Sequence, residues 1–236
     1  MVAFDLDRIG PACALARALK GKYGLVKVGN QLFTSLGPAG VRRLAKLVPG
    51  VFLDLKYHDI PNTVAKAVAA AAELPKVRLL TLHALGGGEM MSAARKALAG
   101  YTKPPKLLAV TILTSHDQET LHQVGIEGSI RDRAVKLAQL AQASGMDGVV
   151  ASAHEVPAIR EACGHDFLTL IPAVRPAGAD AQDQSRIATP SEAARAGADY
   201  FVVGRPITAA KNPSLAARQI IQEISKALNE PLSRRI

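Results

Sequence analysis

The sequence predicts a (β/α)8 barrel, the TIM-barrel fold, and three observations support this prediction. Short apolar runs alternate regularly with longer helical patterns along the 236 residues, which suits eight strands and eight helices. The runs are apolar throughout, as expected of parallel strands whose two faces are both covered. An open doubly wound sheet would carry a glycine-rich turn after its first strand, and the sequence has none there. We therefore expect a single barrel domain over residues 1–236.

The predicted strands are the apolar runs themselves, at a spacing that leaves room for a helix after each. In chain order they are Val2–Leu6, Gly24–Val28, Val51–Leu55, Val77–Leu82, Lys106–Ile112, Gly148–Ser152, Phe167–Ile171 and Tyr200–Val203. No Gly/Ser linker, charge block or low-complexity tract divides the chain, so nothing in the sequence marks a domain boundary.

The segments between these runs show helical periodicity with recognisable ends. Pro61 stands where a first helical turn begins, and an apolar stripe follows it at Val64, Ala67, Val68, Ala71 and Ala72. A comparable stripe runs through Arg131–Ser144, and Gly145 is placed to terminate that helix. The last predicted helix is Pro213–Leu228.

The high apolar share suits helices packed on a parallel sheet, and the distribution of charged and aromatic residues argues against a nucleic-acid partner. The apolar share is 48%, only 4% of residues are aromatic, and a net charge of +9 raises the question of nucleic acid. The basic residues are spread along the whole chain at helical spacing, and few aromatic side chains are available to stack bases. We therefore expect no nucleic-acid partner and note that an anionic small substrate accounts for part of the excess charge.

The sequence also predicts where the protein works. No apolar stretch approaches the roughly 20 residues of a membrane span, and the first residues lack the pattern of a signal peptide. Cys13 and Cys163 show neither metal-ligand spacing nor a disulfide framework, so we expect two buried or half-buried free thiols. Free thiols are typical of a reducing compartment, and the predicted location is the cytoplasm, without membrane contact.

Polar side chains follow the ends of most predicted strands. They are Asp5, Lys27, Asp54, Lys56, His83, Thr114, Ser115, Arg175 and Arg205, the last preceded by Gly204. A barrel gathers the C-terminal ends of its strands at one mouth, where barrel enzymes have their active sites. Residues far apart in the sequence are therefore expected to meet in one pocket.

The densest group of charges surrounds the third strand. Asp54 and Lys56 are two positions apart, so on a regular strand both side chains point the same way, and Lys27 on the neighbouring strand can reach them. Alternating lysines and carboxylates keep one another charged in a site shielded from water. One Lys–Asp pair alone would be interpreted as a structural ion pair, whereas Lys27, Asp54, Lys56 and Asp59 together favour an active site.

A second feature is a predicted anion site after the seventh and eighth strands. Barrels often hold a phosphate there with backbone N–H groups and a helix N-terminus. Gly204 would allow a close backbone approach, and Arg205 and Arg175 would supply guanidinium donors. Read alone, each loop could equally be a glycine turn with a surface arginine.

The ten residues Asp54-Leu55-Lys56-Tyr57-His58-Asp59-Ile60-Pro61-Asn62-Thr63 resemble the signature of orotidine 5'-phosphate decarboxylases of the short bacterial type. Further matching segments follow in order along nearly the whole chain. They are Ala3-Phe4-Asp5, Val26-Lys27-Val28-Gly29, Leu82-His83-Ala84, Ala109-Val110-Thr111-Ile112-Leu113-Thr114-Ser115, Asp147-Gly148-Val149-Val150, Arg175-Pro176, Asp183-Gln184 and Gly204-Arg205-Pro206. The resemblance implies a carboxy-lyase that converts orotidine 5'-phosphate to UMP and CO2, the last step of de novo UMP biosynthesis.

The resemblance also implies a role for each matching residue. Lys56 would protonate C6 of the pyrimidine as CO2 leaves, and Asp54 would lie beside the substrate carboxylate. Asp59 would reach across a homodimer interface into the partner's site, with Thr63 contributed in the same way. The remaining contacts to ribose, base and phosphate would come from Asp5 and Lys27, from Thr114 and Ser115, and from Arg175, Gln184, Gly204 and Arg205, respectively.

Direct decarboxylation leaves a carbanion that the ring cannot delocalise, so electrostatic stabilisation of the transition state must carry the reaction. The resemblance implies neither a metal ion nor an organic cofactor. A sister activity on the same barrel, Mg²⁺-dependent sugar-phosphate decarboxylation or aldol chemistry, would need a further carboxylate, and none occurs between Asp59 and Glu73. The other alternative is a non-catalytic barrel that binds a phosphate ligand, which would leave the position of Lys56 unexplained.

Overall fold

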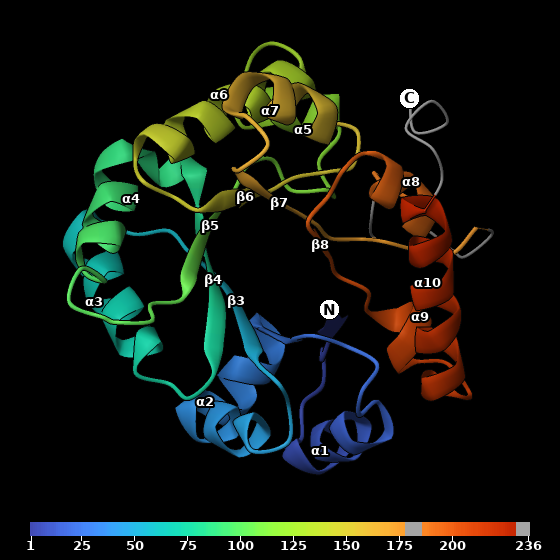
Figure 1. Ribbon diagram of the computed structural model, residues 1–236. Helices are drawn as coiled ribbons and strands as arrows, with labels where there is room; N and C mark the ends of the chain where they lie inside the picture. The colour runs from blue at the N-terminus through green and yellow to red at the C-terminus, as the bar shows by residue number, and fades with distance from the viewer. Residues whose placement is uncertain (178–185, 230–236) are drawn as a thin grey trace.

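The computed structural model describes residues 1–177 and 186–229, and within them eight parallel strands form one sheet in sequential order, a (β/α)8 barrel as predicted (Figure 1). The barrel closes between the first strand and the chain just after the eighth strand, through a parallel bridge between Val2 and Val203. There the Ala3 amide donates to the Val203 carbonyl at 2.8 Å. The strands are β1 (Val2–Ala3), β2 (Val26–Gly29), β3 (Val51–Tyr57), β4 (Val77–His83), β5 (Lys106–Val110), β6 (Gly148–Val150), β7 (Leu168–Ile171) and β8 (Tyr200–Phe201).

The helices form an outer ring around these strands, and the chain passes around the ring in order (Figure 1). They are α1 (Ile9–Ala18), α2 (Asn30–Ala45), α3 (Pro61–Ala72), α4 (Gly87–Lys96), α5 (Gln118–Gln123), α6 (Ile130–Ala143), α7 (Val156–Cys163), α8 (Pro190–Arg195), α9 (Arg205–Thr208) and α10 (Pro213–Leu228), with a short 3-10 helix η1 (Ala84–Gly86) before α4. Because α1 packs against α10, the outer ring also closes.

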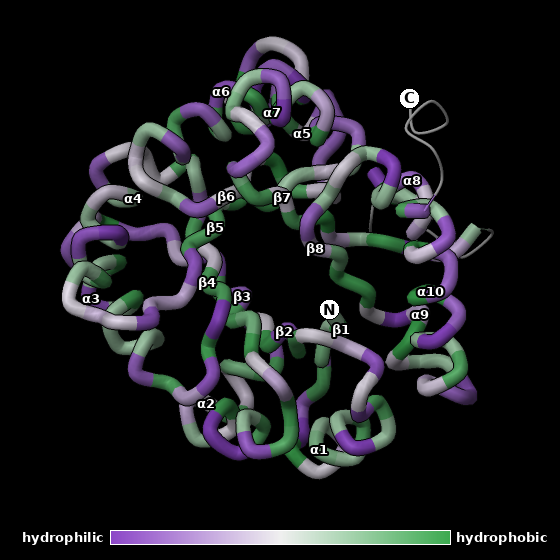
Figure 2. The backbone as a smooth tube through the Cα atoms, viewed as in Figure 1, coloured by the Kyte–Doolittle hydropathy of each residue, from purple (hydrophilic) through white to green (hydrophobic). Residues whose placement is uncertain are grey.

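The strands separate two apolar cores, which explains why their sequences are apolar on both faces. On β3, Leu53 belongs to the large core between sheet and helices, whereas Phe52 belongs to the smaller core inside the barrel. Figure 2 shows hydrophobic residues gathered along the strands and on parts of the helices. The alternation brings Asp54 onto the same inward face as Phe52, directly above the inner core.

The predicted helix ends are confirmed. Helix α3 begins at Pro61, and α10 spans Pro213–Leu228 with the Asn212 side chain accepting from the Leu215 amide. Gly145 follows α6 with a φ of +81°, the left-handed conformation that glycine adopts most readily. Both cysteines are buried free thiols, as expected, and no helix in the described ranges is long and apolar enough to cross a membrane.

Several strands are shorter than the apolar runs that predicted them. β1 ends at Ala3 rather than Leu6, β5 at Val110 rather than Ile112, and β8 at Phe201 rather than Val203. The residues just beyond these ends, such as Phe4 and Ile112, remain buried. An apolar run reports burial, so it extends past the last residue that is assigned to a strand.

Candidate active site

A cavity of about 540 Å³ opens at the C-terminal mouth of the barrel. Its lining combines apolar side chains of the inner core with polar ones from the strand ends and the loops that follow them. Nine of the residues predicted from the sequence lie there together: Asp5, Lys27, Asp54, Lys56, Thr114, Ser115, Arg175, Gly204 and Arg205. The topology thus brings together side chains that are as much as two hundred positions apart in the chain.

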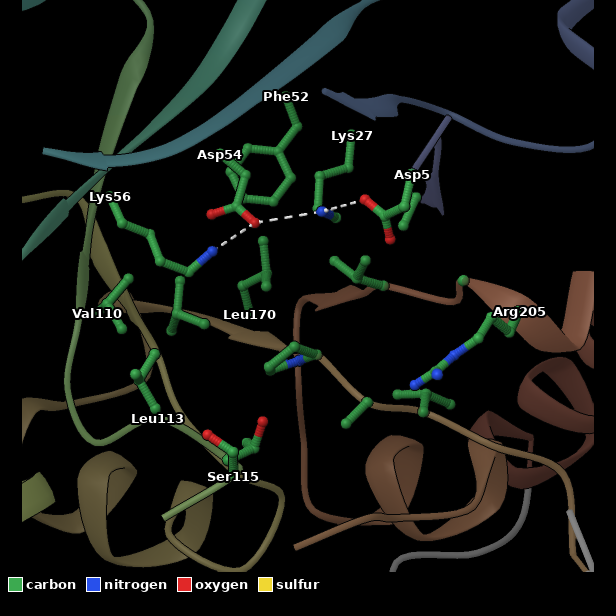
Figure 3. A pocket seen from close by; sticks show the side chains of 18 of the residues that line it. Asp5, Lys27, Phe52, Asp54, Lys56, Val110, Leu113, Ser115, Leu170 and Arg205 are labelled. Carbon is green, nitrogen blue, oxygen red and sulfur yellow. Dashed lines mark hydrogen bonds and ion pairs between the residues drawn. The ribbon is translucent and has the colours of Figure 1, made fainter. Parts of the chain in front are cut away.

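A continuous chain of alternating charges crosses one side of the cavity (Figure 3). Lys56 Nζ lies 2.9 Å from Asp54 Oδ2, and the same oxygen lies 3.5 Å from Lys27 Nζ. Lys27 in turn contacts Asp5 Oδ1 at 3.1 Å. One oxygen of a buried carboxylate therefore lies between two ammonium groups, an arrangement that holds both lysines close to the centre of the mouth.

The ionisation of Asp54 follows from these contacts. Burial alone would raise the pKa of Asp54, because it removes water from the charged form. The charges of Lys56 and Lys27 and the hydrogen bonds from Lys56 and Thr81 outweigh burial, and they bring the pKa of Asp54 below its ordinary value. The site is therefore built to keep a carboxylate ionised in a largely dehydrated place.

The strand that carries Asp54 and Lys56 is not regular, contrary to the reasoning that predicted their convergence. Leu53 pairs with Leu80 and Tyr57 with Leu82, so four steps along β3 match two steps along β4. Within this bulge Lys56 has a φ of +49°, a conformation that residues with a side chain seldom adopt. The side chains converge as expected, but an irregular backbone brings them together.

Thr81 on β4 is a site residue that the sequence reasoning missed. Its side chain is fully buried beneath Asp54, and its hydroxyl donates to Asp54 Oδ1 at 2.9 Å. The same hydroxyl oxygen accepts from the Lys56 amide at 3.0 Å. A threonine in an apolar strand gives no signal of its own, and only its place opposite the Asp54–Lys56 segment could have indicated it.

The opposite side of the cavity is basic. Arg205 extends into it from the start of α9, across from the Asp54–Lys56 pair (Figure 3), and Gly204 is the N-cap of that helix. Arg175 is only 6% exposed, and its amide donates to the Ala188 carbonyl at 2.9 Å. Two arginines and two lysines around one cavity, with Arg205 across from Lys56, suit a ligand with separated negative charges.

The loop after β5 is held in place by a second group that the sequence reasoning missed. Arg186 donates through its guanidinium group to the carbonyls of Ile112 and Leu113, and its backbone amide donates to the Thr114 carbonyl at 3.1 Å. The same guanidinium forms a buried ion pair with Glu155. Arg186 therefore fixes the backbone that presents Thr114 and Ser115 to the cavity.

Two predicted residues of the described ranges, Asp59 and Thr63, do not line this cavity. Asp59 and Thr63 are exposed on the chain after β3, and the Asp59 carboxylate accepts only the neighbouring Ile60 amide among the hydrogen bonds of the described residues. Gln184 lies outside the described residues. Asp59 thus forms no ion pair with the lysines of its own subunit within the part of the chain that the structure describes.

The loops after β3 and β4 lie side by side at the edge of the mouth. The rings of His58 and His83 stack with their centroids 5.4 Å apart. Burial and the charges of nearby groups lower the pKa of His83 to about 4, so its ring is neutral at ordinary pH. Ile60 and Leu85, which belong to the same two loops, are 66% and 46% exposed.

Comparisons with known proteins agree on one family. Residues 1–220 match the orotidine 5'-phosphate decarboxylase / HUMPS family. The chain is 56% identical over 225 residues to the orotidine 5'-phosphate decarboxylase of Geobacter sulfurreducens, with 94% of each chain covered. It is 54% identical to that of Trichlorobacter lovleyi over 94% of this chain and 93% of the other. A crystal structure of the Lactobacillus acidophilus enzyme of the same name superposes with a TM-score of 0.80 at 37% identity, covering 97% of this chain and 98% of that one.

Proposed function

We propose a function from the premise that this chain belongs to the orotidine 5'-phosphate decarboxylase / HUMPS family, which it matches over residues 1–220. The protein decarboxylates orotidine 5'-phosphate to UMP and CO2, the last step of de novo UMP biosynthesis. The observation that carries this assignment is the Asp54–Lys56 pair at the barrel mouth, facing Arg205 across one cavity.

The two ends of the cavity have different roles in the proposed reaction. At one end the bond from C6 to the carboxylate breaks, CO2 leaves, and the bonding electrons remain on C6. The Lys56 ammonium stabilises that negative charge before the bond has fully broken, and its proton then passes to C6. Asp54 holds Lys56 in position at 2.9 Å and lies beside the substrate carboxylate.

The phosphate end supplies binding energy away from the reacting atom. Arg175, Gly204 and Arg205 form the phosphate site, to which we also assign Gln184, which would reach from there towards the base. Energy from such remote contacts can offset the cost of placing and dehydrating the pyrimidine. Between the two ends, Asp5 and Lys27 hold the ribose hydroxyls, and Thr114 and Ser115 contact the base.

The chain after β3 favours this reaction over the Mg²⁺-dependent sugar-phosphate chemistry of the same barrel. A magnesium site is normally built from carboxylate oxygens, phosphate and water. Here Asp59 is followed by Ile60 and by Pro61 at the start of α3, and the next carboxylate is Glu73, beyond the end of that helix. We therefore assign the reaction to the protein's own lysines and carboxylates, with neither a metal ion nor an organic cofactor.

The active unit is proposed to be a homodimer. Asp59 is exposed and forms no ion pair with the lysines of its own subunit among the described residues, although the resemblance assigns it to a network with Lys27, Asp54 and Lys56. The exposed Ile60 and Leu85 provide an apolar surface beside it, and burial of such a surface stabilises association. A second copy packed on these loops would bring Asp59 and Thr63 to the neighbouring cavity. We further propose that this dimer works in the cytoplasm.

The test is a direct assay of purified protein treated with EDTA. Loss of the orotidine 5'-phosphate absorbance, with release of UMP and CO2, is the expected result, and its rate should not depend on added Mg²⁺. Turnover that appears only with added metal, or turnover of a sugar phosphate instead, would contradict the assignment. UMP binding without any turnover would favour the non-catalytic barrel.

A further inference from the structure

Thr81 connects the two residues to which the proposed chemistry is assigned. Its hydroxyl has one hydrogen, which it donates to Asp54 Oδ1 at 2.9 Å. Its oxygen accepts the Lys56 amide at 3.0 Å. A single buried group therefore holds the carboxylate of one residue and the backbone of the other.

The bulge in β3 explains why this hydroxyl is needed. Between Leu53 and Tyr57 the strand leaves its register with β4, and within this irregular stretch the amide of Lys56 donates to the side chain of Thr81 on β4. The hydroxyl oxygen of Thr81 thus serves as the acceptor that a backbone carbonyl supplies in a regular ladder. It supports Lys56 in the left-handed conformation, with a φ of +49°, which is unfavourable for a residue with a side chain.

The same hydroxyl orients the Asp54 carboxylate. Oδ2 of Asp54 faces Lys56 and Lys27, at 2.9 and 3.5 Å, whereas Oδ1 faces Thr81 alone among the hydrogen bonds of the described residues. With both oxygens engaged, rotation of the carboxylate would break a contact on each side. Asp54 is thereby held with one oxygen directed at the two ammonium groups.

Thr81 is not part of the cavity lining, and its side chain is 0% exposed. It therefore acts through Asp54 and Lys56 rather than by touching a ligand. Its neighbours on the inward face, such as Leu79, are apolar, so a valine of similar shape would fill the same space. What valine would lack is the hydroxyl.

We propose that Thr81 is a positioning residue for decarboxylation, which fixes the Lys56 ammonium against Asp54 through its two hydrogen bonds. The proposal rests on the proposed function, because it assigns the proton transfer to Lys56. A displaced ammonium would stabilise the carbanion less well, whereas the phosphate contacts at the other end of the cavity would be unaffected. The predicted effect is therefore on turnover and not on binding.

The test compares Thr81→Val with Thr81→Ser by steady-state kinetics and UMP binding. Thr81→Val should lower kcat by about 10- to 100-fold, the effect of one hydrogen bond to a charged group, while the Kd for UMP changes by less than about threefold. Thr81→Ser keeps the hydroxyl and should stay within about threefold of wild-type kcat. Thr169→Val is the matched control, because Thr169 is equally buried and donates to the Asp199 carboxylate outside the cavity lining.

The pH profile of kcat/KM distinguishes a positioning role of the Thr81 hydroxyl from a role in packing alone. The Thr81 hydrogen bond helps to keep the pKa of Asp54 low, so its removal raises that pKa. The acid limb of kcat/KM should therefore move to higher pH in Thr81→Val and remain in place in Thr81→Ser and Thr169→Val. If Thr81→Val does not fold, Thr81→Ala and Thr81→Ser make the same comparison, and the serine variant should be at least about tenfold faster.

Two results would overturn the proposal. One is a Thr81→Val enzyme with wild-type kcat and an unmoved acid limb, and the other is an equal loss of kcat in the valine and serine variants. An inactive wild-type protein would instead contradict the proposed function itself. The two failures are therefore distinguishable in one set of measurements.

Discussion

Lys56 Nζ lies 2.9 Å from Asp54 Oδ2, and Lys27 Nζ reaches the same oxygen from the other side at 3.5 Å. The Asp54 carboxylate is thus the centre of the charge chain, with a lysine on each side. The two lysines differ in their surroundings. Lys27 also contacts the carboxylate of Asp5, whereas the side chain of Lys56 is about one third exposed at the cavity. Lys56 is therefore the cation that is free to approach a substrate.

Replacing Lys56 with alanine should abolish the reaction and leave the nucleotide site intact. The change removes both the ammonium that stabilises the carbanion and the nearest proton donor, so we expect kcat to fall by at least about 10³-fold. UMP should still bind, because Arg175 and Arg205 are untouched, and calorimetry can measure its Kd. Lys66→Ala, at an exposed position on α3, is the control and should match wild type. Wild-type turnover in Lys56→Ala would show that the mechanism is wrong.

The proposed sharing of Asp59 between subunits can be tested by mixing two inactive variants. If Asp59 serves the partner's site, a dimer of one Lys56→Ala subunit and one Asp59→Ala subunit contains one complete site. Random mixing after dissociation should then restore about a quarter of the wild-type activity. The activity of the mixture, relative to each variant alone, is the measurement.

The control mixture combines Lys56→Ala with Asp54→Ala, and it should stay inactive. Lys56 and Asp54 contact each other within one subunit, so no mixed dimer of these variants has a complete site. If the Lys56→Ala and Asp59→Ala mixture also stays inactive while mixed dimers are shown to form, Asp59 does not serve the partner's site.

His83 should make the protein less stable in mild acid. Burial, with the charges of His58 and Lys56 next in importance, lowers the pKa of His83 from 6.5 to about 4. Between these values the unfolded chain binds a proton that the folded protein does not, so the free energy of unfolding falls as the pH falls from 6.5 towards 4. Replacing His83 with glutamine removes this contribution.

Urea unfolding at about pH 7 and about pH 5 measures the effect. The loss of stability between the two pH values should be smaller in His83→Gln than in wild type. His122→Gln, at an exposed position on α5, should behave like wild type. An unchanged pH dependence in His83→Gln would show that other groups cause the loss.

The buried ion pair between Arg186 and Glu155 should affect both stability and substrate affinity. Arg186→Met leaves a buried carboxylate without its cation, which costs about 3–5 kcal/mol in the free energy of unfolding. It also removes the donors to Ile112 and Leu113, so KM should rise as the loop that carries Thr114 loosens. Urea unfolding and steady-state kinetics measure the two effects.

The double variant Glu155→Leu/Arg186→Met measures the coupling free energy between the two residues. Because it leaves no unpaired charge, it should lose less stability than the two single variants added together. Arg218→Met, at an exposed position on α10, should be nearly neutral. Strict additivity of the single losses would mean that the ion pair contributes nothing to stability.

Much of the fold could be predicted from local patterns. The eight apolar runs each contain or overlap a strand, and Pro61, Gly145 and Pro213 mark helix ends where expected. These predictions succeeded because proline and glycine act through their own backbone, and because strands covered on both faces must be apolar throughout. Whether residues 1–236 form one domain stays a prediction, as the described ranges leave out 178–185 and 230–236.

The sequence by itself determined which charged groups meet at the mouth, because the order of the strands brings Asp5, Lys27, Asp54 and Arg205 to the same end of one barrel. Only the tertiary structure decided how they are held. The bulge in β3, the hydroxyl of Thr81 under Asp54 and the Glu155–Arg186 pair depend on register and contacts between distant segments. In strands that are apolar on both faces the residue pattern does not alternate, so it does not distinguish one register from another, and the register is set when the barrel closes.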